Sequence, residues 1–142
     1  MPQHRLLLRL VERGLEEHVR HEILETEAYF TATFRASHPQ IVQQFWDTAW
    51  KNHADLSWYL RYVMARHAWE ATHRLPFLKV PVLILVGSSD LAGGSAHFPA
   101  SQMLADRIAG STLKIMDKVA HGFFWQDPAM TSTLLEEWFA AH

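Results

Sequence analysis

The stretch VPVLILVGSSD (Val80–Asp90) decides the fold that this sequence predicts. Six of its first seven residues are apolar, and a glycine, two serines and an acid follow. A short apolar run bounded by turn residues is typical of a strand that is covered on both faces, as in a parallel sheet. We therefore predict a strand over residues 80–86, with Asp90 just beyond its end.

The residues after this strand continue with a helix, a second strand and a last helix. Pro99–Ile108 is predicted as a helix that Gly110 closes, and TLKIM (Thr112–Met116) as the second strand. Asp127 is the expected N-cap of the last helix, with Pro128 in its first turn. A strand–helix–strand crossover makes the two strands parallel. The last helix is expected to bury its apolar residues Met130, Leu134, Leu135, Trp138 and Phe139.

Residues 1–75 have a helical period instead. One helix is predicted over residues 5–24, weakened by Gly14; a second begins at Pro39; and a third follows Asp55 as N-cap. The second and third helices carry apolar residues on more than one side, which predicts that each packs between two bodies.

The composition excludes several classes of function. A net charge of -2 gives no positive patch for nucleic acid or for an anionic membrane, and the lack of cysteine excludes disulfides and thiol nucleophiles. Arg9 and Glu12 interrupt the N-terminal apolar run too early for a signal peptide, and no segment is long enough to span a membrane. We expect a soluble cytoplasmic protein with no nucleic-acid or membrane partner.

Two polar residues follow the two predicted strands. Asp90 follows the first strand, and His121 follows the second in DKVAHGFFWQDP. Functional side chains of open parallel sheets gather at the carboxyl ends of the strands, so we expect Asp90 and His121 to lie within side-chain reach. An acid that orients a histidine acting as general base makes up two thirds of a nucleophilic triad.

These segments resemble a known family. VPVLILVGSSD, the loop and helix after it, and STLKIMDKVAHGFFWQDP with its terminal helix are similar to the last third of the α/β-hydrolase superfamily; GSSDLAGGSAH resembles the acid loop of its small esterases, enol-lactonases and C–C-bond hydrolases. The resemblance implies an α/β fold, the C-terminal portion of an α/β-hydrolase, with residues 1–75 as the helical cap and 76–142 as the core segment. It also implies a Ser-His-Asp mechanism on an ester, lactone or related acyl substrate, with His121 as base, Asp90 as acid and no cofactor.

The sequence departs from this family at the nucleophile. The family places its nucleophile on a Gly-x-Ser-x-Gly turn before the acid, and no such turn occurs here. Ser95 in GGSAH follows a glycine but lies several residues past the strand, so we interpret it as inert. The oxyanion-hole segment is missing as well. We expect the chain to be inactive alone, and an N-terminal half or a second copy to complete the sheet.

Other residues suggest weaker hypotheses. His18, His21, Glu22 and Glu25 share a helical segment, and His21 and Glu25 are one turn apart, but no third ligand for a metal is evident. We interpret these residues as a solvated helix face and expect no metal site.

The aromatic residues of the cap have two possible roles. Trp46, Trp50, Trp58 and Trp69 have helical spacing, which favours core packing, yet a cap must also line the substrate pocket. The candidate substrate-binding residues are Trp46, Trp50, Trp58 and Phe123.

Two classes of function remain open at this stage. One is the hydrolase, completed by a nucleophile from elsewhere. The alternative is a non-catalytic module that binds a partner, or associates with itself, through an open sheet edge. A third possibility is that two copies complete each other and recruit Ser95.

Overall fold

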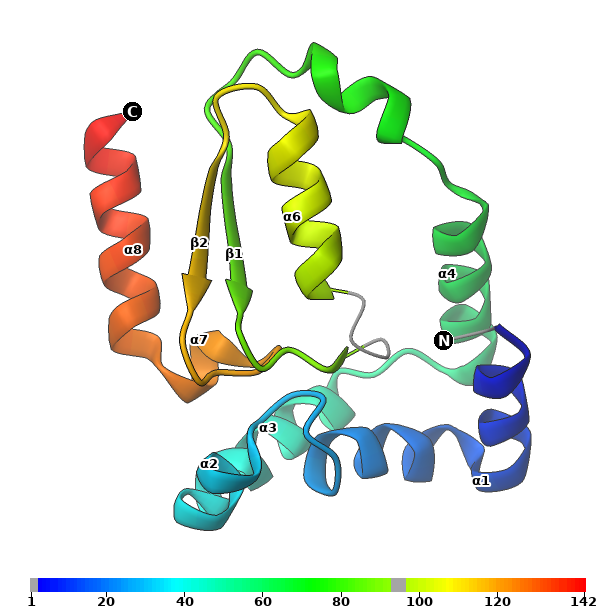
Figure 1. The fold of residues 1–142 in the computed structure, drawn as a ribbon. Helices are drawn as coiled ribbons and strands as arrows, with labels where there is room; N and C mark the ends of the chain where they lie inside the picture. The colour runs from blue at the N-terminus through cyan, green and yellow to red at the C-terminus, as the bar shows by residue number, and fades with distance from the viewer. Residues whose placement is uncertain (1–2, 93–96) are drawn as a thin grey trace.

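The computed structural model describes residues 3–92 and 97–142. The described part is mostly helical, with one small parallel sheet (Figure 1). Its elements in chain order are α1 (Gln3–Leu24), α2 (Ala32–Ser37), α3 (Pro39–Lys51), α4 (Leu56–Ala68), the 3-10 helix η1 (Thr72–Phe77), β1 (Leu83–Gly87), α6 (His97–Arg107), β2 (Thr112–Met116), α7 (Phe123–Gln126) and α8 (Pro128–Ala141).

The two strands pair in parallel, as the crossover predicts. Leu83 lies opposite Thr112 and Gly87 opposite Met116, so the strands run in register over their full length. The predicted strand over 80–86 is wrong at its start: pairing begins at Leu83. Pro81 has no N–H to donate to a ladder, and Val80 is 64% exposed.

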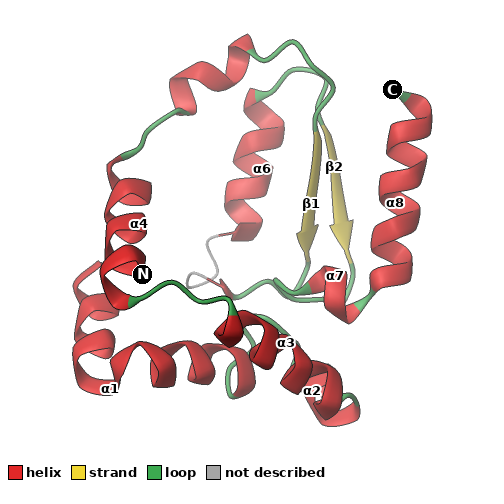
Figure 2. Cartoon of the chain, turned by 180° about the vertical axis from the view of Figure 1, so that it is seen from behind, coloured by secondary structure: helices red, strands yellow, loops and turns green. Residues whose placement is uncertain are grey.

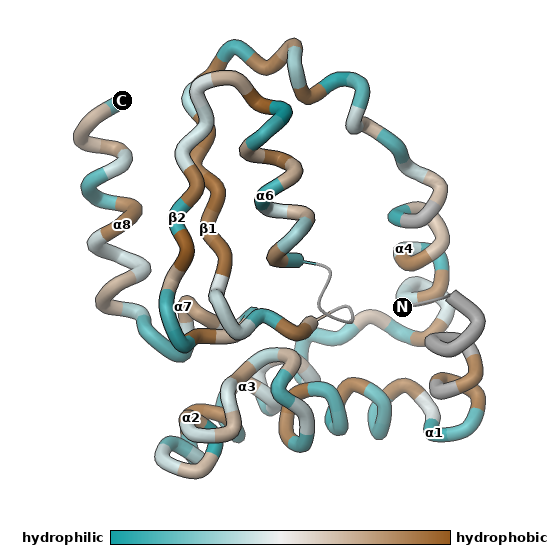
Figure 3. Tube along the Cα trace, viewed as in Figure 1, coloured by the Kyte–Doolittle hydropathy of each residue, from teal (hydrophilic) through white to brown (hydrophobic). Residues whose placement is uncertain are grey.

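The sheet has only two strands within the described residues, in the order β1-β2. Ile84 and Val86 of β1 are buried, and Figure 3 shows that β1 is hydrophobic along its length. Helix α6 lies on one side of the strands and α8 on the other in both ribbon views (Figures 1 and 2). The arrangement is thus a small α/β unit in which β1 has one neighbour, and no described strand pairs with its other edge.

The apolar face of α8 is less covered than its sequence predicts. Phe139 is 74% exposed, Met130 44% and Leu135 37%. The prediction that these side chains are buried is therefore wrong, because the described chain places little against that face of the helix.

The helical segment, defined here as residues 3–77, has its own core. Ile23, Phe30, Phe34, Val42 and Trp46 pack together from α1, α2, α3 and the loop between α1 and α2. Gly14 has φ 75° and ψ 167° and kinks α1, which agrees with the weakening predicted at that residue.

Helix α4 stands apart from this core. Asp55 caps its N-terminus as predicted, by accepting a hydrogen bond from the N–H of Trp58. However, Trp58, Tyr62 and Met64 are all more than half exposed. The prediction that this helix packs between two bodies is wrong for the described chain.

Three short elements have no counterpart in the sequence prediction: α2, η1 and α7. Each is six residues or fewer, too short for a periodic pattern to reveal. Over the described ranges, no helix is both long and apolar enough to cross a membrane.

Candidate functional site

Asp90 lies in a tight turn directly after β1. Its backbone N–H donates to the carbonyl oxygen of Gly87 at 3.2 Å, and its side-chain oxygen Oδ1 accepts a hydrogen bond from the N–H of Ala92 at 3.0 Å. The residue is only 4% exposed. Because a buried carboxylate needs partners for its oxygens, the turn fixes where the acid points. We call residues 88–92 the acid loop.

His121 lies in the loop after β2, residues 117–122, which we call the histidine loop. The two loops are joined by backbone hydrogen bonds: Ser88 N–H donates to Met116 at 2.8 Å and Ser89 N–H donates to Val119 at 3.0 Å. A side chain at Gly87 would overlap the carbonyl oxygen of Val119. Glycine at the end of β1 therefore permits the close approach of the two loops.

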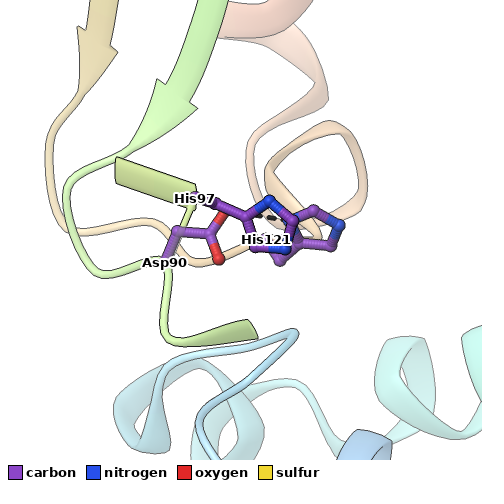
Figure 4. A group of neighbouring side chains, drawn as sticks. All are labelled: Asp90, His97 and His121. Carbon is purple, nitrogen blue, oxygen red and sulfur yellow. Dashed lines mark hydrogen bonds and ion pairs between the residues drawn. The ribbon is translucent and has the colours of Figure 1, made fainter. Parts of the chain in front are cut away.

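The approach brings Asp90 and His121 together. Oδ2 of Asp90 lies 2.8 Å from Nδ1 of His121, and Figure 4 shows the carboxylate directed at the imidazole. The predicted proximity of these two residues is confirmed. A carboxylate only accepts, so Nδ1 of His121 donates and its Nε2 is left for another group. The histidine side chain is 37% exposed and the acid side chain only 2%.

Two further side chains surround the imidazole of His121. The His97 ring lies 4.5 Å from it between centroids, and the Tyr29 ring meets it edge-on at 5.6 Å. Burial, together with the nearby charges of His121 and Arg66, lowers the pKa of His97, and the Asp90 carboxylate opposes this shift. Burial also raises the pKa of the Tyr29 phenol.

Sequence reasoning missed both residues. His97 lies at the start of α6, facing the carboxyl ends of the strands, and this position is a signal that could have found it. No such signal exists for Tyr29, because its position depends on how the helical segment packs.

The histidine loop is anchored to the helical segment. The N–H of Gly122 donates to the carbonyl oxygen of Tyr29 at 2.8 Å, and that of His121 donates to Ala28 at 3.4 Å. Gln126 of α7 adds three side-chain hydrogen bonds: Oε1 accepts from Ala120 N–H, and Nε2 donates to Lys118 O and to Thr31 Oγ1. These bonds fix the backbone around His121.

The predicted substrate-binding residues lie in three different surroundings. Trp46 belongs to the helical core at 7% exposure, and its ring stacks on that of Trp50, which in turn stacks on His53. Trp58 is 61% exposed, and the guanidinium group of Arg61 lies over its ring. Phe123 is partly buried and packs against Phe124. In the described chain no ring contact or hydrogen bond joins any of the four candidates to Asp90 or His121. Ser95 lies outside the described residues.

An open pocket of about 440 Å³, lined mostly by polar residues, lies beside the acid and histidine loops. Neither Asp90 nor His121 lines it. Its lining residues are Glu27, Thr31, Thr33, Phe34, Ser37, Ser89, Lys118 and Gln126.

One group of three side chains among the described residues has donor atoms suited to a metal. Asp90, His97 and His121 each place one possible ligand atom within 4.8 Å of the others. His21 and Glu25 of the predicted solvated face also meet, with Nδ1 of the histidine 2.8 Å from the carboxylate. The hydrogen bond from His21 lowers the pKa of Glu25, whose side chain is about half exposed.

Comparison with models of protein families finds no match to this sequence, and comparison with curated proteins finds none either. The site is therefore interpreted from its geometry.

Proposed function

We propose that this chain supplies the acid and the base of an acyl hydrolase of the α/β-hydrolase type. The single observation that supports this most is the hydrogen bond between buried Asp90 and partly exposed His121. An ion pair on a protein surface has both partners in water, whereas here the acid is enclosed and no hydrogen bond from the described residues engages the second nitrogen of the base. That asymmetry is what general-base catalysis requires.

In the proposed reaction, Nε2 of His121 takes the proton of an attacking hydroxyl group. The oxygen then adds to the acyl carbon, the leaving group departs with the proton from His121, and water repeats the sequence to release the acid product. Asp90 keeps the proton on Nδ1 and stabilises the imidazolium that forms at each step.

The nucleophile is proposed to come from outside the described residues. Across residues 3–92 and 97–142, no serine or threonine hydroxyl is hydrogen-bonded to His121. The attacking group would be supplied by a further polypeptide segment or, for slow background hydrolysis, by water itself.

The test uses the full chain and an activated ester, p-nitrophenyl acetate. Without the nucleophile the chain should form no acyl-enzyme, but if His121 is a general base it should still activate water and hydrolyse the ester slightly faster than buffer does. This excess rate should fall in heavy water. His121→Asn should return the rate to that of buffer, and Asp90→Asn should lower the excess over buffer by about tenfold or more, because the correct tautomer is lost.

His21→Asn is the matched control for this experiment. It also removes an imidazole that is hydrogen-bonded to a carboxylate, but from an exposed helix face, and should leave the rate unchanged. A wild-type rate equal to that of His121→Asn would contradict the proposal.

A second function is favoured by the open edge of β1. Its strand is hydrophobic, and in the described chain only β2 pairs with it. Unpaired strand edges recruit other chains. A non-catalytic module would therefore associate through this edge, and sedimentation at several concentrations would show it. Replacing Leu85 of β1 by proline should then abolish association, while Leu135→Pro in α8 serves as a control for general unfolding.

A further inference from the structure

We propose that Asp90, His97 and His121 form a binding site for a divalent transition metal, with Zn²⁺ as the best-suited ion. One possible ligand atom from each residue lies within 4.8 Å of the other two. Figure 4 shows the three side chains converging from the acid loop, the start of α6 and the histidine loop. This site goes beyond the proposed hydrolase, which does not use His97.

The donor set suits this class of metal. Two imidazoles and one carboxylate are common ligands of zinc, whereas calcium and magnesium prefer sites made of oxygen atoms alone. Three protein ligands also leave one position of a tetrahedral ion for water or a small ligand.

The distances are close to those a metal needs. With metal–ligand bonds of about 2.0–2.2 Å, the ligand atoms of a tetrahedral zinc lie about 3.4 Å apart. The observed spacing of up to 4.8 Å closes to this value with a shift of about 1.4 Å. The Asp90–His121 pair at 2.8 Å is closer than this spacing. These two atoms must therefore move apart by about 0.6 Å, while the larger shift falls on the His97 ring.

Two of the ligands are held before a metal arrives. Asp90 is buried and its Oδ1 is bound by the N–H of Ala92, which leaves Oδ2 directed at the site. The backbone of His121 is tied to Ala28, and its neighbour Gly122 to Tyr29. Because these two ligands are already held, metal binding costs less conformational entropy. The third ligand, His97, is partly exposed and leaves the site accessible.

Metal binding and the acid–base pair exclude each other. The ion replaces the proton that Nδ1 of His121 shares with Oδ2 of Asp90, and that proton leaves to solvent. Zinc should therefore inhibit the ester hydrolysis that depends on His121, and inhibition should weaken when His97 is replaced.

The experiment titrates the full chain with Co²⁺, whose visible spectrum reports tetrahedral coordination, and then displaces it with Zn²⁺. We expect one equivalent of bound Co²⁺ with a tetrahedral spectrum. His97→Ala should weaken binding by at least about tenfold, because loss of even a supporting residue has that effect. Asp90→Asn should do the same; circular dichroism checks that each variant is folded.

The chain has ten histidines, so background binding needs its own control. His21→Ala removes the exposed His21–Glu25 pair and should leave the tetrahedral spectrum intact. Equal affinity in wild type and His97→Ala, or loss of the spectrum in His21→Ala, would overturn the proposal. His97 takes no part in the proposed catalytic step. A failed metal titration would therefore not decide the outcome of the ester hydrolysis test.

Discussion

The N–H of Gly122 donates a hydrogen bond of 2.8 Å to the carbonyl oxygen of Tyr29, which joins the histidine loop to the helical segment. A methyl group on Gly122 would lie 2.8 Å from that same oxygen and 3.1 Å from the Phe30 ring. Gly122→Ala should therefore lower the free energy of unfolding in urea by about 1–3 kcal/mol, as overpacking does. It should also slow the proposed ester hydrolysis, which depends on His121. An unchanged unfolding midpoint would mean that the methyl group is accommodated without cost, which would contradict this prediction.

Gly87→Ala should have a larger effect. The new methyl group would overlap the carbonyl oxygen of Val119, and backbone atoms cannot rotate out of the way as a side chain does. Gly110→Ala is the comparison, since nothing lies within 4 Å there and only its positive φ is strained, at about 1–2 kcal/mol. Urea unfolding should rank Gly87→Ala as the less stable variant, and the reverse order would contradict the close approach of the two loops.

Gln126→Ala should loosen the histidine loop. Three side-chain hydrogen bonds are lost, to Ala120, Lys118 and Thr31. At about 0.5–1.5 kcal/mol each, the expected loss of unfolding free energy is about 1.5–4.5 kcal/mol. Amide hydrogen exchange at Ala120 should become faster. Gln43→Ala, which removes one exposed bond to Asp47, should change neither measurement.

Phe30→Ala should destabilise the core of the helical segment. Phe30 is fully buried and its ring contacts Phe34 and Phe45. Removing a buried phenylalanine side chain typically costs about 3–5 kcal/mol. Thermal unfolding measures the loss. Phe139→Ala, at a site that is 74% exposed, should change the midpoint little.

The cap of α4 should weaken in acid. Hydrogen bonds from the Trp58 N–H and the Ser57 hydroxyl lower the pKa of Asp55. Its folded pKa lies below the unfolded value, so the stabilisation is present above the unfolded pKa and is lost as pH falls through the folded one. The amide resonance of Trp58 should follow this titration, with a midpoint below that of an ordinary aspartate. Asp55→Ala should abolish the transition, and Asp47→Ala should not.

The sequence predicts the site better than it predicts the surroundings. Asp90 and His121 could be paired because two parallel strands must end at one edge, a rule that needs only the strand–helix–strand order. His97 and Tyr29 could not be placed in this way. Their positions depend on the packing of α6 and the helical segment, which no local pattern encodes.

Burial was the least predictable property. The apolar faces of α4 and α8 were expected to be covered, since periodicity shows which side of a helix is apolar. It does not show whether another element reaches that side. Trp58 and Phe139 illustrate the difference, at 61% and 74% exposure.

The attachment of the histidine loop to Ala28 and Tyr29 has a mechanical consequence. The histidine loop is bonded on two sides, to the acid loop through Ser88 and Ser89 and to the helical segment through Ala28 and Tyr29. The contact between Asp90 and His121 therefore lies at the junction of the strands with the helices. A displacement of either part would strain this contact.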